Sequence, residues 1–312
     1  MTTGSHGAGL NLDGISPFHV IAAFDIGSNS IKMSVARLTA GNTVQEFHWR
    51  AETTRLGAGI DDTHRLAEDR IEASIAALST FISEARQFGA TRFIAVATEA
   101  ARVTENGESF LARLRSEFGI EIEAITGDRE AQLTFAGLDP RIDRGGTLIV
   151  ADIGGASSEI IEAHDGSMVL SASLPIGSGR LTDRFAVTDP PLAEELAAAR
   201  VAARQVLMEH RWASGCDRLV IIGGTAEYAR RLLPHDWPAY PAEIESMLGR
   251  LTAVHSTELA TMIEASVLRA RVLPAGVAII VALIELITPD MILGAASGIR
   301  SGLLHAAFRG EL

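Results

Sequence analysis

The alternation of apolar and polar positions near the N-terminus predicts three consecutive strands. Val20–Ile26 and Ile31–Leu38 are apolar or alternating runs joined by a short loop of small residues, and Thr43–Trp49 alternates again. So short a loop joins neighbouring antiparallel strands. We therefore expect the chain to begin as a β-meander.

The hydrophobic pattern then changes to a helical period. Apolar residues recur at helical spacing from Leu66 to Phe88, and Gly89 ends the run. Three further elements are expected: strand Arg92–Ala97, helix Glu108–Phe118 and strand Ile120–Ile125. Strands that alternate with helices are typical of α/β folds.

The same order of elements begins again in the second half of the chain. The expected elements are strands Thr147–Ile153, Glu159–His164 and Met168–Leu174, helix Leu192–Trp212 and strand Leu219–Ile222. In addition, Phe24–Ser30 aligns without gaps with Ala151–Ser157. We therefore expect an internally duplicated chain with two related domains.

Each copy of the repeat places an aspartate at the end of a strand and follows it with glycine and small polar residues. The loop residues are Gly27, Ser28, Asn29 and Ser30 in the first copy, and Gly154, Gly155, Ala156 and Ser157 in the second. Backbone N–H groups in such loops can converge on an anion such as phosphate. One loop of this kind is usually an ordinary hairpin turn, but two equivalent loops favour a pair of phosphate sites that face each other across a cleft.

The two aspartates are candidate metal ligands. Asp25 and Asp152 carry carboxylate oxygens, which Mg²⁺ prefers, and they could bind it directly or through water. The alternative is that each aspartate braces its own turn.

Length and cysteine content bear on organisation and compartment. A chain of 312 residues fits two domains, and we expect a flexible tail over 1–16, an N-terminal domain over 17–133 and a C-terminal domain over 134–312. The single cysteine, Cys216, cannot form an internal disulfide and is expected to be inert core. A chain without disulfides fits a reducing compartment, so we expect a cytoplasmic protein.

Charge and hydropathy exclude two classes of partner. The net charge of −12 gives no general attraction to nucleic acid, so an anionic substrate must be captured by local groups. The most apolar run, Pro274–Ile287, is shorter than the ~20 residues of a membrane span. We expect it to be a buried core helix, with no membrane partner.

Several short motifs together resemble the exopolyphosphatase/guanosine pentaphosphate phosphatase (Ppx/GppA) family in order and spacing. They are Asp25–Ser30, Arg55–Gly59, Ala97–Arg102, Thr126–Ala131, Asp152–Gly155, Leu174–Thr182, Ile222–Ala226, Leu273–Gly276 and Gly298–Leu304. The resemblance implies an α/β fold with two ribonuclease H-like domains of the actin, Hsp70 and sugar-kinase type, flanking a cleft. It is to the short form of the family, which lacks additional C-terminal helical domains.

The resemblance also implies roles for individual residues. Glu130 matches the proposed general base of the family. By pattern alone, the alternative is an exposed acidic residue in the first turn of a helix, stabilised by the helix dipole. Glu159 matches a residue thought to bind metal or orient water, with an exposed strand position as the alternative. Arg102 and Arg180 match positions that face phosphate, and the guanidinium fork suits phosphate oxygens. Arg55 and Arg129 are weaker candidates.

The predicted function is metal-assisted hydrolysis of a phosphoanhydride. The leading substrate is inorganic polyphosphate, from which terminal orthophosphate would be released with Mg²⁺ or Mn²⁺ as cofactor. The closest alternative is guanosine pentaphosphate or another nucleotide polyphosphate, and a homodimer is left open. A kinase of the same fold group is disfavoured because no acceptor-sugar module is evident. Glu130 disfavours a non-catalytic binder. Ala156 stands where the family usually has glycine, which predicts altered affinity rather than lost function.

Overall fold

The computed structural model describes residues 19–39, 41, 43–295 and 298–312, which form two compact units. The first unit takes its described residues from Met1–Leu56, Ile60–Asp143 and Ser297–Leu312, and the second from Gly57–Gly59 and Arg144–Ala296. The flexible tail expected over residues 1–16 lies outside the described residues.

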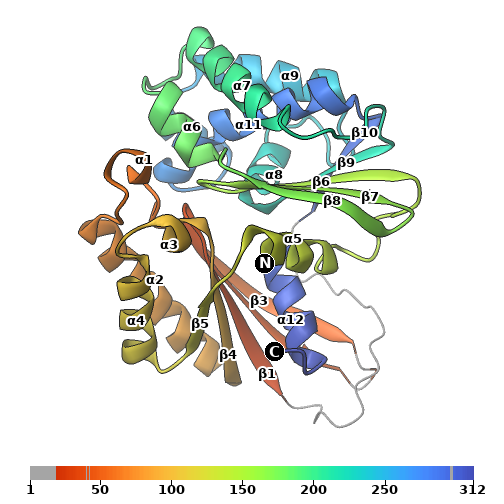
Figure 1. Ribbon diagram of the computed structural model, residues 1–312. Coiled ribbons are helices and arrows are strands. Elements are labelled where there is room, and N and C mark those ends of the chain that lie inside the picture. Colours follow the sequence, from red (N-terminus) through yellow and green to blue (C-terminus); the bar gives the residue numbers. More distant parts are fainter. Residues whose placement is uncertain (1–18, 40, 42, 296–297) are drawn as a thin grey trace. The chain divides into compact units, whose positions relative to one another are not determined.

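The first unit is a five-stranded mixed sheet with helices on both faces. Its strands are β1 (Val20–Ile26), β2 (Ser30–Leu38), β3 (Val44–Thr53), β4 (Ala90–Ala97) and β5 (Glu121–Ala124), in the spatial order β3-β2-β1-β4-β5. Its helices are α1 (Ile60–Thr63), α2 (Glu68–Gln87), α3 (Glu99–Val103), α4 (Gly107–Phe118), α5 (Gly127–Ala136) and α12 (Ile299–Phe308). Figure 1 shows α2 and α4 on one face of this sheet and α12 on the other.

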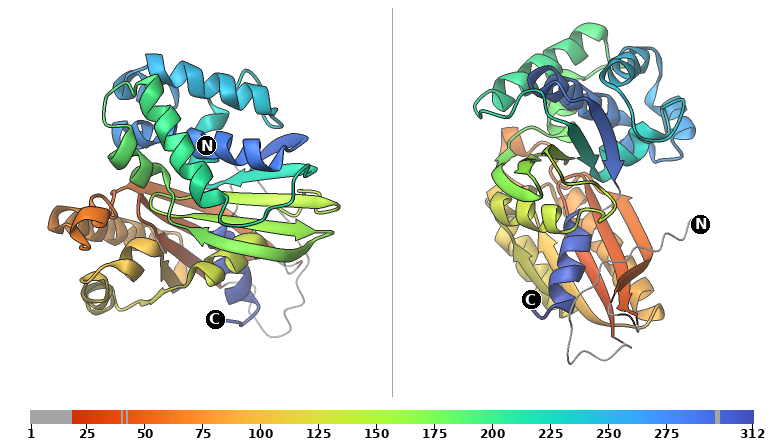
Figure 2. Two further views of the ribbon diagram at one scale, coloured as in Figure 1. Left: turned by 45° about the horizontal axis from the view of Figure 1, so that its top comes forward. Right: turned by 90° about the vertical axis from the view of Figure 1, so that its right-hand side faces the viewer.

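The second unit repeats this arrangement. Its strands are β6 (Thr147–Ile153), β7 (Ser158–His164), β8 (Ser167–Leu174), β9 (Arg218–Ile222) and β10 (Met291–Ala295), in the order β10-β9-β6-β7-β8. Its helices are α6 (Ser178–Phe185), α7 (Ala193–Leu207), α8 (Gly223–Arg230), α9 (Pro241–Arg250), α10 (Ser256–Met262) and α11 (Val267–Ile287), with a 3₁₀ turn η1 at Leu251–Ala253. Helices α6, α7, α9 and α10 pack around α11 (Figure 2).

Strand directions confirm the duplication predicted from the sequence. In each unit the first strand pairs antiparallel with the second and parallel with the fourth, and the fourth pairs parallel with the fifth. We call β1–β2 with its loop Gly27–Ser30 the first hairpin, and β6–β7 with its loop Gly154–Ser157 the second hairpin. Both loops close with the same backbone bond, from Gly27 N to Ser30 O at 3.2 Å and from Gly154 N to Ser157 O at 3.0 Å.

The unit boundaries differ from the expected domain ranges at two places. The expected division at 133/134 falls inside α5, whereas the compact units divide after Asp143. The C-terminal helix α12 packs against α5 and β1, which places it in the first unit rather than the second. The order of elements in the sequence does not show that the C-terminal segment packs in the first unit.

The most apolar segment is a buried helix, as predicted, but it is longer than predicted. Pro274 lies inside α11 instead of starting it, so the helix has 21 residues. By length and composition it could cross a membrane, and among the described residues it is the one helix that could. The prediction that this apolar segment is too short to span a membrane was therefore wrong. Most of α11 is buried in the core of the second unit, where Cys216 also lies, and burial raises the pKa of that thiol to about 12.

Candidate active site

The second hairpin is held by the beginning of α6. The carbonyl of Gly154 accepts a hydrogen bond from Ser178 N at 2.9 Å, and that of Gly155 accepts from the next two amides of α6 at 2.8 and 2.9 Å. The carbonyl of Ala156 accepts from Arg180 Nη1 at 2.6 Å. Three consecutive loop carbonyls therefore turn toward α6.

Peptide geometry turns the amide groups of the same loop the other way. The C=O and N–H of a trans peptide point in opposite directions, so the amides of Gly155, Ala156 and Ser157 face away from α6. Successive N–H groups that share a side form a concave site for an anion. The close fit depends on Gly177, where a Cβ would lie 2.5 Å from the carbonyl of Gly155. The amides of the predicted phosphate loop therefore share one side of the loop, away from α6.

Two carboxylates lie opposite each other beside this loop. Asp152 on β6 and Glu159 on β7 are directly paired in register, so their side chains share one face of the sheet. Glu159 is only 1% exposed, and its Oε1 accepts a hydrogen bond from Ser173 Oγ at 2.8 Å. Like charges placed opposite each other are unfavourable without a cation.

This pair fits a hard divalent cation. Mg²⁺ is commonly held by one or two carboxylates, with waters and substrate phosphates as its other ligands. A cluster of three or more His, Cys, Asp or Glu side chains suited to a metal does not occur among the described residues. The donor set therefore suits a metal that shares its coordination with substrate, and does not suit a fully enclosed structural ion.

A buried arginine, Arg269, packs on the start of α8, the same turn that lies against Asp152. A Cβ on Gly223, which has φ +76°, would lie 2.6 Å from Asp152 Oδ1, so the start of α8 is tight against that side chain. The guanidinium of Arg269 packs on Gly224, donates to Thr225 Oγ1 at 3.3 Å and lies 5.2 Å from the Tyr228 ring. Burial lowers its pKa, and its Nε has no hydrogen-bond partner among the described residues. The sequence motifs assigned no role to Arg269.

The first hairpin is held by different neighbours. Ser28 Oγ accepts a hydrogen bond from Ala100 N at the start of α3, at 3.2 Å. The carbonyl of Asn29 accepts from the amides of Thr54 and Arg55 at 3.1 and 2.9 Å. One loop carbonyl and one hydroxyl thus anchor this loop, compared with three carbonyls in the second hairpin.

Asp25, predicted as a metal ligand, pairs with a lysine. Lys32 lies opposite it on β2, and Lys32 Nζ is 3.2 Å from Asp25 Oδ2. The carboxylate side chain is 6% exposed and the lysine 26% exposed. Asp25 and Asp152 therefore have different partners, although their backbones are equivalent.

Glu130 lies in the first turn of α5, where Thr126 Oγ1 caps the helix by accepting from Arg129 N at 3.2 Å. Its side chain is 8% exposed, which rules out the alternative of a solvated helix charge. Arg102 Nη1 donates to the carbonyl of Ile125 at 2.7 Å, just before this cap. Arg102 therefore braces the segment that positions Glu130.

The remaining arginines that were predicted to bind phosphate have structural contacts. Arg180 holds the carbonyl of Ala156, as described above. Arg129 is half-buried at the start of α5, where its amide donates to Thr126 Oγ1, and the backbone of Arg55 has φ +52° just after β3. A buried carboxylate that carried no role in the sequence reading, Glu99, lies at the start of α3. The hydrophobic pattern of the sequence does not show that this carboxylate is buried.

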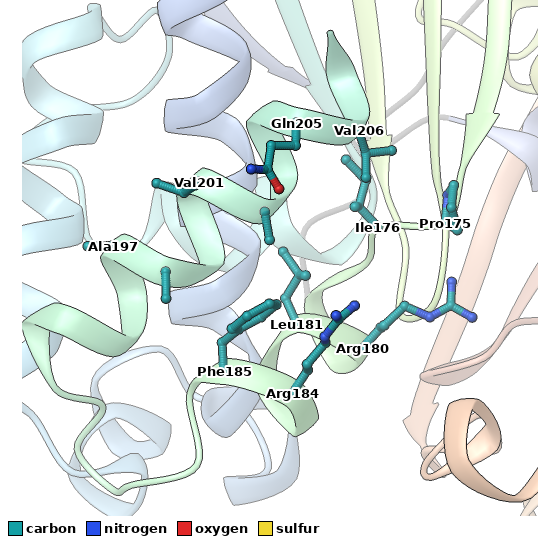
Figure 3. Close-up of a pocket in the computed structure, with 12 residues that line it drawn as sticks. Pro175, Ile176, Arg180, Leu181, Arg184, Phe185, Ala197, Val201, Gln205 and Val206 are labelled. Atoms are coloured by element: carbon teal, nitrogen blue, oxygen red, sulfur yellow. The ribbon is translucent and has the colours of Figure 1, made fainter. Parts of the chain in front are cut away.

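A groove of about 590 Å³ lies between α6 and α7 (Figure 3). Its walls are mainly aliphatic, with Leu181, Val201 and Val206 among them, and Arg180 and Arg184 line its α6 side. Its lining contains neither the carboxylate pair nor the loop of the second hairpin. The groove is therefore separate from the candidate chemistry, although Arg180 belongs to both.

Comparison with known proteins identifies the family. The model of the Ppx/GppA phosphatase family matches residues 34–309, and the chain belongs to this family. It is 35% identical over 196 residues to exopolyphosphatase 2 of Mycobacterium tuberculosis, covering 60% of this chain and 61% of that protein. It is 30% identical over 300 residues to the guanosine-5'-triphosphate,3'-diphosphate pyrophosphatase of Vibrio vulnificus, covering 94% and 59%. The chain thus spans about three fifths of the length of these relatives.

Solved structures agree with the fold. A crystal structure of the Aquifex aeolicus Ppx/GppA family member matches with a TM-score of 0.74 and 29% identity, covering 94% of this chain and 98% of that one. An exopolyphosphatase from Cytophaga hutchinsonii matches with a TM-score of 0.83 at 21% identity, covering 94% and 98%. The second match shows the fold alone. The expected class, two ribonuclease H-like domains of the actin, Hsp70 and sugar-kinase type, is confirmed.

Proposed function

We propose that this chain is a phosphoanhydride hydrolase that releases terminal orthophosphate from inorganic polyphosphate. The observation that carries the proposal is the second hairpin, where three amides share one side of a loop next to the Asp152 and Glu159 pair. Such a site offers donors to phosphate and ligands to the cation that phosphate brings. The names of the relatives support the same reaction class.

Asp152 and Glu159 would hold Mg²⁺ or Mn²⁺, which supplies charge neutralisation on phosphoryl oxygens when bound. The amides of the second hairpin bind and orient the terminal phosphate, and Arg180 and α6 fix those amides by holding the loop carbonyls. Arg269 offers a further cation at the start of α8. Positioning and electrostatics of this kind account for most of the catalysis in phosphoryl transfer.

Glu130 is the proposed general base. Its carboxylate takes a proton from water as the water oxygen forms a bond to the terminal phosphorus. The bond from that phosphorus to its bridging oxygen breaks, and the bridging oxygen leaves with the shortened chain. Orthophosphate and a polyphosphate one unit shorter are the products. Arg102 acts as a positioning residue, because it braces the segment before α5.

Guanosine pentaphosphate is the second candidate substrate. The relative that aligns with 94% of this chain is named a guanosine-5'-triphosphate,3'-diphosphate pyrophosphatase. The same loop and carboxylates would serve either substrate, because both present a terminal phosphoanhydride.

Phosphate release by the purified full chain tests these proposals. Inorganic polyphosphate, guanosine pentaphosphate and ATP are compared with Mg²⁺, with Mn²⁺ and with a chelator. We expect chelator-sensitive release from polyphosphate, strongly reduced in Glu159→Gln and unchanged in Glu194→Gln, an exposed carboxylate of the same unit. Faster release from guanosine pentaphosphate would make the nucleotide the substrate. ATP formation from ADP without phosphate release would indicate a kinase, and binding without turnover would indicate a non-catalytic binder.

A further inference from the structure

The groove between α6 and α7 differs in charge from the chain as a whole. The chain has a net charge of −12, whereas the residues that line the groove include two arginines, Arg180 and Arg184, and no aspartate or glutamate. Both arginines belong to α6 and therefore lie on one side of the groove. The groove thus carries a local positive charge on a chain that repels anions overall.

The rest of the lining is mostly aliphatic. Ile176 and Leu181 are buried, and Val201 on the α7 side is 52% exposed. The volume of about 590 Å³ lies within the range of ~300–1,000 Å³ that is usual for small-molecule sites. The groove therefore suits a small ligand that is mainly apolar and carries one anionic group.

Arg184 is placed to bind the anionic group of such a ligand. Its side chain is exposed, and its guanidinium lies 5.2 Å from the ring of Phe185. No carboxylate of the described residues forms an ion pair with it. The planar fork of a guanidinium matches the two oxygens of a carboxylate. A ligand carboxylate at the α6 side of the groove would therefore find a cation there.

Arg180 connects the groove to the second hairpin. Its side chain lines the groove, while its Nη1 donates to the Ala156 carbonyl at 2.6 Å. Figure 3 shows its guanidinium pointing away from Val201, so the aliphatic part of the side chain forms this wall of the groove. A ligand that packs on this wall restricts the rotamers of Arg180 and so stabilises its hydrogen bond to the loop.

We propose that the groove is a regulatory site for a free aliphatic carboxylate. The carboxylate binds Arg184, and the hydrocarbon chain packs between Leu181 and Val201 and on the aliphatic part of Arg180. Occupation of the groove holds the second hairpin in its anion-binding conformation and raises its affinity for phosphate, a step that rests on the proposed function. A second copy of the chain is a less suitable occupant, because two copies with a net charge of −12 repel each other.

Calorimetric titration of the purified full chain with octanoate tests the site without turnover. We expect one octanoate per chain, and octanol should bind at least about tenfold more weakly, the scale of a lost charge-assisted hydrogen bond. Arg184→Gln should weaken octanoate by the same factor and leave octanol unchanged. Ala198→Glu adds a negative charge to the lining and should abolish octanoate binding. Ala193→Glu, at an exposed position of α7 outside the lining, is the matched control and should bind octanoate like the wild type.

Coupling to the second hairpin is measured by titrating orthophosphate with and without octanoate, with Mg²⁺ present. Octanoate should tighten orthophosphate binding about fivefold, and reciprocity requires orthophosphate to tighten octanoate binding by the same factor. Arg180→Met keeps an apolar side chain at the wall and removes the donor to Ala156. This variant should still bind octanoate and should lose the coupling.

Folding of each variant is checked by circular dichroism. If octanoate does not bind to the folded wild-type chain, or binds no better than octanol, the site is overturned. A dimer that dissociates in Ala198→Glu would also overturn it, because a second copy would then cover the groove. Octanoate binding without any change in orthophosphate affinity would overturn the regulatory role and support the binding site. Failure of the hydrolase proposal is distinguishable, since a chain that releases no phosphate from polyphosphate can still be titrated with octanoate.

Discussion

The first and second hairpins close with the same backbone hydrogen bond, yet different elements surround them. The second hairpin has three carbonyls anchored by α6 and a pair of opposed carboxylates. The first hairpin is anchored by α3 and the end of β3, and it contains the Asp25 and Lys32 ion pair. Duplication has kept the path of the chain and changed the charges. A repeat in sequence therefore predicts equivalent geometry but not equivalent chemistry.

The largest effect is expected from substitution of Glu130. A loss of turnover in this variant would show that the first unit contributes a catalytic group in addition to binding substrate. Glu130→Gln should lower kcat by about 10² or more, the scale of a lost general base, and leave substrate affinity and thermal stability nearly unchanged. Steady-state phosphate release measures this. Glu123→Gln, an exposed carboxylate on β5, is the control and should retain full activity. Near wild-type turnover of Glu130→Gln would remove it from the mechanism.

The two aspartates provide a direct comparison of the hairpins. Asp152→Asn should raise the metal concentration for half-maximal activity roughly tenfold or more, since even residues behind a metal ligand change affinity by about 10–100-fold. Asp25→Asn should leave that metal requirement within about twofold, because Lys32 and not metal is its partner. The measurement is a metal titration of activity. Equal shifts in the two variants would mean that both hairpins bind metal.

A third prediction tests the fit between the second hairpin and α6. Gly177→Ala adds a methyl group that would lie 2.5 Å from the Gly155 carbonyl, so the loop must move. We expect a loss of about 1–3 kcal/mol in the free energy of unfolding and weaker binding of orthophosphate.

Gly249→Ala is the matched control for this change. The added methyl group meets nothing within 4 Å in α9, and it should stabilise slightly. Urea unfolding and phosphate titration give both quantities. If the Gly177→Ala variant folds and its affinity for phosphate is unchanged, anion binding does not depend on how the loop packs against α6.

The smallest effect concerns acid stability, which should differ between the two units. Burial lowers the pKa of His305 on α12 of the first unit, so the unfolded chain takes up a proton at higher pH than the folded one. The stability from neutral His305 is complete above the unfolded pKa of about 6.5 and is lost as pH falls through the lower folded pKa. His305→Gln should flatten this part of the pH profile of unfolding. Cys216 labelling, which requires opening of the second unit, should not change with this variant.

Much of the fold could be predicted because the strands are short apolar runs that alternate with amphipathic helices. The expected Thr147–Ile153 strand coincides with β6, and the helix expected from Leu66 to Phe88 contains α2. The helix α6 was missed because eight residues hold little periodic signal, and its position depends on the loop carbonyls that it contacts. The docking of α12 on α5 was missed for a related reason, since local patterns do not specify partners.

The candidate site was predicted in part. The loops and their aspartates follow from the repeat, and the resemblance supplied Glu130 and Glu159. Sequence position could not show that Lys32 faces Asp25, because the pairing depends on the strand register. It also could not show that Arg102 and Arg180 donate to backbone carbonyls, since nothing in a sequence fixes the direction of a guanidinium group.

The contact between α6 and the second hairpin has an electronic consequence. A carbonyl that accepts a hydrogen bond withdraws electron density through its peptide bond, so the N–H on the other side becomes a stronger donor. The carbonyls of Gly154 and Gly155 accept from the first amides of α6, at the positive end of that helix. The loop thus transmits the polarity of α6 across two peptide planes. A phosphate bound on the far side, as proposed, would experience the field of the helix without touching it.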